Sequence, residues 1–119
     1  MSLENITQLI HRTYDAFNQR DIDATLQSMH PQVQWPNGWE GGWVHGHDEV
    51  RNYWTRQWNE IDPRVTPVSI TERPDGRVNV RVHQVVKDKQ GKLVADGFVN
   101  HVYTFENGRV VKMEIEPAD

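Results

Sequence analysis

The strongest constraint on the fold is a change of hydrophobic periodicity near Asp62-Pro63. Before this point, apolar residues recur three and four positions apart, as on one face of a helix. After it, apolar and polar residues alternate, as in a half-buried strand. The 119 residues allow one domain, residues 1–119. Helices followed by a meander of strands predict the α+β class, with the helices packed on one face of an antiparallel sheet.

Three helices are predicted in the first half of the chain. They cover residues 3–17, a short segment after Asp21, and residues 47–61. The second helix should end before Pro31, because the residue before a proline is pushed away from helical geometry. The inward stripe of the third helix contains Val50, Tyr53, Trp54, Gln57, Trp58 and Ile61.

Short strands are predicted at 33–35 and 43–45, and long strands at 65–72, 78–87, 93–105 and 110–116. Pro74-Asp75-Gly76 and Glu106-Asn107-Gly108 have the residue types of tight turns. The sheet must curl around the three helices to bury them, which makes a cone with an open mouth. We do not expect a parallel strand pair at its centre.

Several classes of protein are disfavoured by composition. No apolar run approaches the roughly 18 residues of a membrane span, and the first residues do not resemble a signal peptide. The net charge of -4 argues against binding to nucleic acid, which requires a basic face. The absence of cysteine excludes a disulfide scaffold and suits a reducing compartment, so we expect a cytoplasmic location.

Three segments carry a resemblance to a known superfamily: residues 14–23 (YDAFNQRDID), 45–54 (HGHDEVRNYW) and 101–113 (HVYTFENGRVVKM). They resemble the nuclear transport factor 2-like superfamily and, within it, the SnoaL-like and ketosteroid isomerase branch. The resemblance covers nearly the whole chain and implies a cone-shaped, cystatin-like roll. It leaves the function open, because the superfamily includes isomerases, cyclases, epoxide hydrolases and non-catalytic binders.

The resemblance also places two functional positions of the ketosteroid isomerases. Anchored on Pro36, their general-base aspartate falls on Trp35, and an indole cannot shuttle a proton between carbons. Anchored on Phe105, the protonated aspartate of their oxyanion hole falls on His101, which can still donate a hydrogen bond. We therefore expect no steroid isomerase activity, but a changed form of the oxyanion site.

Two further positions follow from the same resemblance. The oxyanion tyrosine of the isomerases falls on Thr13, with Tyr14 one position later. The arginine–carboxylate set of the epoxide hydrolases is missing, since its positions fall near Val82, Gln84 and Ile115. The catalytic candidates are therefore His101 and Tyr14.

Candidate ligand-binding residues are those expected to face the inside of the cone. They are Trp35, Trp54, Trp58, Gln84, Tyr103 and Met113. Rigid indole rings would form a flat slot for a hydrophobic or aromatic molecule. Each has a structural alternative: the tryptophans as plain core, His101 as a hydrogen-bonded core histidine, and Gln84 as a structural amide, which is the favoured interpretation for Gln84.

The remaining histidines do not have the pattern of a metal site. His45 and His47 are two residues apart, which puts both rings on one strand face. A metal site needs a third ligand, and no Asp or Glu is fixed in register with these two histidines or with His30. We therefore expect no metal.

The glycine-rich loop contains Trp39 and Trp43. These residues form either a lid over the mouth of the cone or a contact with a partner subunit.

The sheet face away from the helices is expected to pair with a second copy of the chain. Phe98 and Val102 lie there among polar residues, namely Arg81, His83, Asp96 and Asn100. This mixture is typical of a polar homodimer contact, and a solvated face is the alternative.

Two functions remain open from the sequence. One is an isomerase, cyclase, hydratase or hydrolase that acts on a small hydrophobic or aromatic molecule without a metal or organic cofactor. The other is a non-catalytic domain that binds a ligand or a protein partner. The aspartate missing at Trp35 favours the second function, and His101 inside the cone favours the first.

Overall fold

The computed structural model describes residues 2–118 and has the predicted α+β order. Its elements are α1 (Leu3–Asn18), α2 (Ile22–Leu26), β1 (Met29–Pro36), β2 (Trp43–His45), α3 (Gly46–Glu60), β3 (Ile61–Glu72), β4 (Val78–Asp88), β5 (Leu93–Glu106) and β6 (Arg109–Pro117). None of the helices within the described part has the length and apolarity that a membrane crossing requires.

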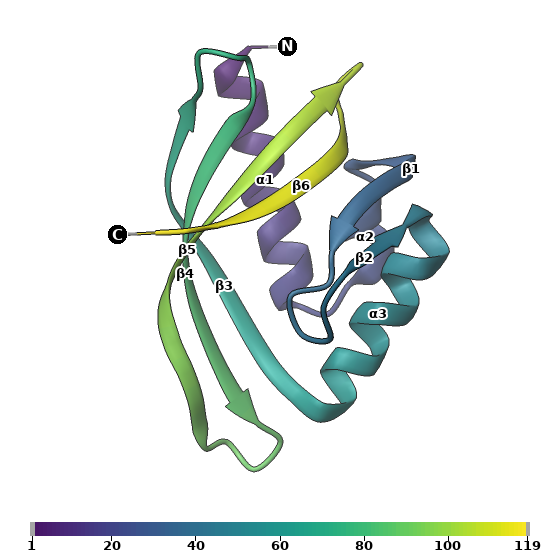
Figure 1. The fold of residues 1–119 in the computed structure, drawn as a ribbon, viewed down its shortest axis with the longest axis vertical. Helices are drawn as coiled ribbons and strands as arrows, with labels where there is room; N and C mark the ends of the chain where they lie inside the picture. The colour runs from purple at the N-terminus through teal and green to yellow at the C-terminus, as the bar shows by residue number, and fades with distance from the viewer. Residues whose placement is uncertain (1, 119) are drawn as a thin grey trace.

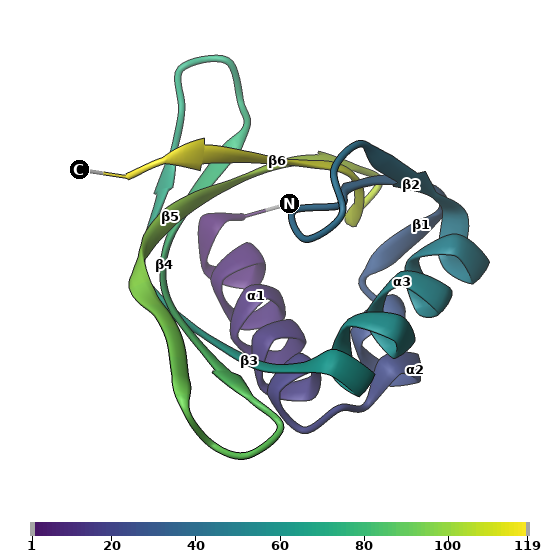
Figure 2. The ribbon, with the colours of Figure 1, turned by 60° about the horizontal axis from the view of Figure 1, so that its bottom comes forward.

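The six strands form one sheet in the order β2-β1-β6-β5-β4-β3. The sheet curls without closing, and α1 lies in its concavity (Figure 1, Figure 2). The helix α3 lies on the opposite side of this concavity and connects β2 to β3 (Figure 2). The prediction of helices packed inside a strongly curved sheet is therefore confirmed.

One strand pair departs from the expected pattern. β1 and β6 are parallel, with Met29 beside Val110 and Gln34 beside Lys112, whereas the other pairs are antiparallel. Parallel strands need a long crossover, and here the chain from β2 to β5 supplies it. The sheet is thus mostly rather than entirely antiparallel, and the expectation is corrected at this pair.

The start of β1 also differs from the prediction. The strand begins at Met29 and contains Pro31, although Pro31 was expected only to end the second helix. β2 pairs with β1 only at residues 34–36, so the edge beside Pro31 is free on that side. A proline, which lacks a backbone donor, is tolerated at such an edge.

The concave face of the sheet carries the core. Val78, Val80 and Val82 on β4 are fully buried, as the alternation of that strand predicts. They belong to one cluster with Ile10 and Tyr14 of α1 and with Val50, Tyr53 and Trp54 of α3. The same helices that fill the cone therefore hold the side chains of the candidate site.

On the outer face of the sheet, the exposure of Phe98 agrees with the prediction, whereas that of Val102 does not. Phe98 is 45% exposed, as expected, but Val102 is fully buried. Val102 lies between Asn79 and Glu114 in the strand register. These two strand neighbours each bind an arginine, Asn79 binding Arg73 at 2.7 Å and Glu114 binding Arg77 at 3.1 Å, so long side chains lie on this face beside Val102. Val102 is therefore not available to a partner.

Candidate functional site

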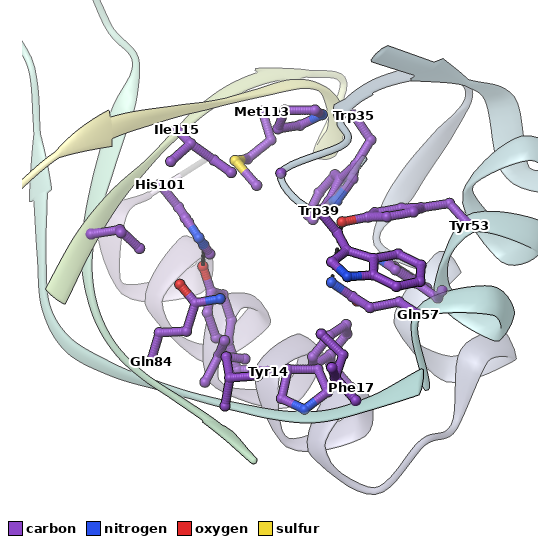
Figure 3. A pocket seen from close by; sticks show the side chains of 18 of the residues that line it. Tyr14, Phe17, Trp35, Trp39, Tyr53, Gln57, Gln84, His101, Met113 and Ile115 are labelled. Carbon is purple, nitrogen blue, oxygen red and sulfur yellow. Dashed lines mark hydrogen bonds between the residues drawn. The ribbon is translucent and has the colours of Figure 1, made fainter. Parts of the chain in front are cut away.

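A cavity of about 430 Å³ lies between the concave face of the sheet and the helices α1 and α3 (Figure 3). This volume is within the range of sites for small organic ligands. Among the residues that the structure describes, none of those lining the cavity is Asp, Glu, Lys or Arg. The polar groups of the lining residues are neutral amides, hydroxyls, indole N–H groups and one imidazole, which favours an uncharged ligand.

A chain of three hydrogen-bonded side chains forms one wall of this cavity. The hydroxyl of Tyr14, on α1, lies 2.6 Å from Nδ1 of His101 and 2.7 Å from the hydroxyl of Tyr103, both on β5. His101 and Tyr103 are two residues apart on one strand and therefore face the same side. The candidates His101, Tyr14 and Tyr103 are thus brought together, and Figure 3 shows Tyr14 pointing up to His101.

Burial sets the protonation of all three groups. It lowers the pKa of His101 to about 4, because no carboxylate within the described residues offsets the loss of hydration. Burial likewise raises the pKa of Tyr14 and that of Tyr103 well above the usual value of a phenol. At neutral pH, the imidazole and both phenols are therefore uncharged, and the imidazole has one donor and one acceptor nitrogen.

A pair of polar side chains faces this chain of three across the cavity. The amide Nε2 of Gln57 donates to the hydroxyl of Tyr53 at 3.2 Å, and both residues come from α3. In Figure 3 they lie on the side of the cavity opposite His101 and Tyr14. Burial raises the pKa of Tyr53, so its hydroxyl also stays neutral. These two residues were not predicted as site residues; the signal for them was a glutamine four residues after a tyrosine in an otherwise apolar stripe.

Aromatic rings cover much of the surface between the chain of three polar side chains and the Tyr53–Gln57 pair. Trp35 meets Trp54 edge to face at 5.6 Å between ring centroids, and Phe17 meets Trp54 in the same way at 5.4 Å. Trp35 and Trp54 line the cavity as expected. Edge-to-face contact is a preferred geometry of aromatic pairs, so these contacts stabilise the positions of the rings along this wall.

Trp58 does not line the cavity, contrary to expectation. It is one turn further along α3, where its ring stacks on Trp54 at 6.0 Å and the guanidinium of Arg20 lies 4.9 Å from it. Phe17 also packs against it at 5.1 Å. These contacts hold Trp58 behind Trp54, so it supports the cavity wall rather than facing a ligand.

The other two predicted ligand-binding residues, Gln84 and Met113, line the cavity. The side-chain amide of Gln84 makes no hydrogen bond to any residue between 2 and 118, although a structural hydrogen bond was the favoured interpretation. Figure 3 shows this amide on the same side of the cavity as Tyr14. An amide without a protein partner at a cavity wall is available to a ligand.

The glycine-rich loop between β1 and β2 separates the two tryptophans that it was expected to present. Trp39 lines the cavity, whereas Trp43 lies in β2 and is 45% exposed. The loop is held to α3 by Glu40, which accepts hydrogen bonds from Arg56 at 2.9 Å and from Asn37 at 2.8 Å. The position of Trp39 at the cavity fits the lid, and the exposed Trp43 fits a contact with a partner, so both alternatives for the loop stay open.

His30 and His47 have separate hydrogen-bond partners. The ring of His47, in α3, lies with Nε2 2.9 Å from the carbonyl of Met29, and Nδ1 of His30 accepts from the backbone of Gln32 at 3.0 Å. No group of three histidine or carboxylate side chains suited to a metal ion occurs within residues 2–118.

The fold and an apolar cavity with a few convergent polar groups define a small-molecule pocket protein of the nuclear transport factor 2-like superfamily. Residues 10–113 match the SnoaL-like domain family. The chain belongs to this family, which confirms the resemblance read from the sequence. Among curated protein sequences, none matches significantly.

Solved structures agree with this placement. The chain is 31% identical to a nuclear transport factor 2-like protein of unknown function from Burkholderia pseudomallei, with a TM-score of 0.83, covering 99% of this chain and 92% of that one. It is 29% identical to TerC, whose structure was determined after co-crystallisation with polyporic acid (TM-score 0.81; 96% and 91% covered). A putative polyketide cyclase from Sinorhizobium meliloti, 18% identical, shares the fold (TM-score 0.76; 92% and 94% covered).

Proposed function

We propose that this protein binds a neutral, largely apolar and flat small molecule in the cavity and converts it by acid–base chemistry without a metal or organic cofactor. The reaction class is that of an isomerase, cyclase, hydratase or hydrolase. The observation that carries the proposal is His101, a buried neutral imidazole held by Tyr14 at the wall of an uncharged cavity.

The chemistry of the lining supports an uncharged ligand. A carboxylate or phosphate entering the cavity would lose its hydration and meet no cationic side chain from residues 2–118, which is costly. The indoles of Trp35 and Trp54 offer apolar faces, and the polar pairs at opposite walls offer hydrogen bonds. A flat molecule with an oxygen near each end fits both features.

His101 is the group best suited to act on the ligand. Its Nδ1 is occupied by Tyr14, while Nε2 has no partner among residues 2–118 and is not sealed from the cavity. A neutral imidazole can polarise a carbonyl through an N–H donor or accept a proton through a lone pair. Tyr14 fixes the orientation of the ring, which is the task of a catalytic partner residue.

A non-catalytic binding protein of the same fold is the second candidate. The observation in its favour is Trp35 at the position that corresponds to the general base of the isomerases. With an indole there, none of the residues described at the cavity has a carboxylate to remove a proton from carbon. Such a protein would bind the same ligands and release them unchanged.

A fluorescence titration tests the binding step common to both functions. Trp35 and Trp54 line the cavity, so a ligand there should quench tryptophan emission saturably. 2-Acetylnaphthalene, a flat and uncharged aromatic ketone, is the first compound to test, and polyporic acid, with which TerC was co-crystallised and which is an anion at neutral pH, is the charged comparison that should bind more weakly. Gln57→Leu should weaken binding and Trp43→Phe, outside the cavity, should not. Product analysis of the bound compound then separates conversion from binding alone, and no saturable quenching by any neutral aromatic compound would refute the proposal.

We also propose that the chain forms a homodimer through the outer face of the sheet. Phe98 is exposed there, with the ring of His83 stacked on it at 5.0 Å and Arg81 4.6 Å from its centroid. The nearby Asp96 binds His83 at 2.6 Å. An exposed aromatic side chain surrounded by polar groups of both signs supports a polar contact between two copies.

A further inference from the structure

The cavity is elongated along the strand β5. Its lining includes, from one end of this strand to the other, Tyr103, His101, Val99, Ala95 and Val94. Tyr103 and Ala95 are eight residues apart, which corresponds to roughly 25 Å along an extended strand. The cavity is therefore longer than a molecule of two fused rings that lies against one end of it.

The two ends of the cavity differ in the side chains that they present. At the inner end, the ring of Trp35 lies 6.3 Å from that of Tyr103, and Trp54 packs on Trp35. Towards the hairpin that joins β4 and β5, Gln84 is the last polar residue of the lining on the strands β3, β4 and β5 as the structure describes them. Beyond Gln84, at the outer end, the lining residues of these strands are aliphatic, namely Ile61, Pro63, Val86, Val94 and Ala95.

Open space lies beside Gln84, at the boundary between the two ends. In the strand register, Gln84 pairs with Val65 on one side and with Gly97 on the other. Gly97 is two residues from Val99 and therefore faces the same side of β5. A Cβ atom at Gly97 would have no neighbour within 4 Å, and the φ of this residue is not positive. Neither backbone geometry nor packing requires glycine there, so its effect is to leave a passage past Gln84.

A β-bulge enlarges the apolar surface of the outer end. Val86 pairs with Ala95 and Lys87 with Leu93, so Val94 has no partner in the register. A bulge re-aims a side chain, and here the successive residues Val94 and Ala95 both line the cavity. Val94 is 60% exposed, so no side chain from residues 2–118 covers this apolar surface fully.

We infer that the outer end holds an aliphatic chain of the ligand, so that the preferred ligands are neutral molecules with a flat aromatic head and a flexible aliphatic tail. This inference rests on the proposed function and names a substrate class for it. The head lies against Trp35 and Trp54, and the tail passes Gln84 at Gly97 to reach Val94. The strands β4 and β5 bend along their length towards their hairpin (Figure 2), and a flexible chain follows a curved wall better than a further rigid ring does.

Three probes with the same acetyl head test the inference through the quenching of tryptophan emission. 2-Acetylnaphthalene is the head alone, 2-acetyl-6-butylnaphthalene adds four carbons as a chain, and 2-acetylanthracene adds four carbons as a rigid ring. In the wild type, the Kd of the butyl probe should be at least about tenfold lower than that of 2-acetylnaphthalene, since each buried methylene contributes about fourfold and ordering of the chain opposes part of this gain. The anthracene probe should bind more weakly than the butyl probe.

Two substitutions fill the outer end. Gly97→Leu and Ala95→Leu each add an aliphatic side chain where the tail is placed, so both should remove most of the gain that the butyl group gives. The ratio of the two Kd values is measured on the same variant, so a general loss of affinity cancels. Ser69→Leu makes a similar change on β3 outside the cavity and should keep the wild-type ratio. Circular dichroism checks that each variant is folded.

The outcomes separate this inference from the proposed function. A tenfold gain in the wild type that is lost in the leucine variants of Gly97 and Ala95, and kept in Ser69→Leu, would support the inference. Equal Kd values for the two naphthalenes in the wild type, a gain that survives in a folded variant of either residue, or tighter binding of the anthracene probe would overturn it, while saturable quenching by 2-acetylnaphthalene would leave the proposed function standing. No saturable quenching by any of the three probes would refute the proposed function and the tail site together.

Discussion

The two faces of the sheet are made from the same strands but have opposite chemistry. On β5, His101 and Tyr103 face the uncharged cavity, while Asp96 and Phe98 face outward. Outer residues form ion pairs, including Arg73–Glu116 and Arg77–Glu114. The period of two along a strand is enough to separate these environments.

Because the two faces differ in this way, the pKa values of their titratable groups are shifted by different causes. On the cavity side, burial is the first cause of every pKa shift, for His101, Tyr14 and Tyr103 alike. On the outer side, hydrogen bonds with arginine come first, as for Glu116, whose pKa is lowered. The cavity therefore keeps its groups neutral at pH 7, and the outer face keeps its groups charged. Only neutral groups of this kind can exchange donor and acceptor roles with a ligand.

The largest expected effect of a substitution is on the packing of the cavity side. Trp54 is 1% exposed and contacts Phe17, Trp35 and Trp58. Trp54→Ala should lower the free energy of unfolding by about 3–5 kcal/mol, as for other buried large-to-small changes. Trp43→Ala removes an exposed indole and should cost under about 1 kcal/mol, including its contact with Lys112. Urea denaturation measures both, and equal losses would contradict the comparison.

The next effect is on turnover, once a converted ligand is known. His101→Ala should lower kcat at least about 10²-fold, the low end for a general acid or base. His101→Asn should retain more activity if the residue only donates a hydrogen bond. Steady-state kinetics with the wild type and both variants decides this, and an unchanged kcat in His101→Ala would remove His101 from the mechanism.

The sequence predicted the faces of the sheet better than the contacts between its strands. Alternation placed Val78, Val80 and Val82 inward and Phe98 outward, because facing depends only on local period. It did not reveal that β1 pairs in parallel with β6, since these strands are about 80 residues apart and no local pattern encodes their pairing. The burial of Val102 was missed for the same reason: its strand neighbours Asn79 and Glu114, which hold Arg73 and Arg77 beside it, come from two other parts of the chain.

For the candidate site, too, the sequence predicted which residues face inward but not the contacts they make. Position on a face was enough to place His101, Tyr103, Trp35 and Trp54 at the cavity. The two short hydrogen bonds of Tyr14 were not predictable, because they depend on how far α1 sits inside the sheet. Trp58 was misplaced because a helical stripe is wide, and its edge can pack against neighbours instead of facing the cavity.

Protonation of groups on the two faces should lower the free energy of unfolding in different pH ranges. The pKa of His101 is about 4 in the folded protein and about 6.5 when unfolded. The unfolded state therefore binds more protons between these values, and stability falls as the pH falls through this window. Between pH 7 and 5 the loss should be about 2 kcal/mol. The lowered pKa of Glu116 adds its loss only at lower pH, where the unfolded carboxylate begins to protonate.

Urea denaturation at pH 7, 6 and 5 measures this loss. His101→Gln cannot be protonated, so it should flatten the dependence in this range, whereas Arg73→Met, on the outer face, should leave it unchanged. A wild-type slope that persists in His101→Gln would show that another group titrates there and that burial does not control the imidazole.

The smallest expected effect on the folded chain, and the sharpest test of the outer face, comes from Phe98→Asp. Phe98 is 45% exposed, so its replacement should change the free energy of unfolding of a single chain by no more than about 0.5 kcal/mol. In the proposed dimer, however, two added carboxylates would face each other across the contact, beside Asp96. Sedimentation at tens of micromolar should then show a dimer for the wild type and a monomer for Phe98→Asp, with the ligand-induced quenching intact in both. A wild-type monomer, or a dimer that survives the substitution, would show that Phe98 does not lie in a contact between two copies. The outer face would then be a solvated surface, and the two faces of the sheet would differ because one faces a cavity and the other faces solvent.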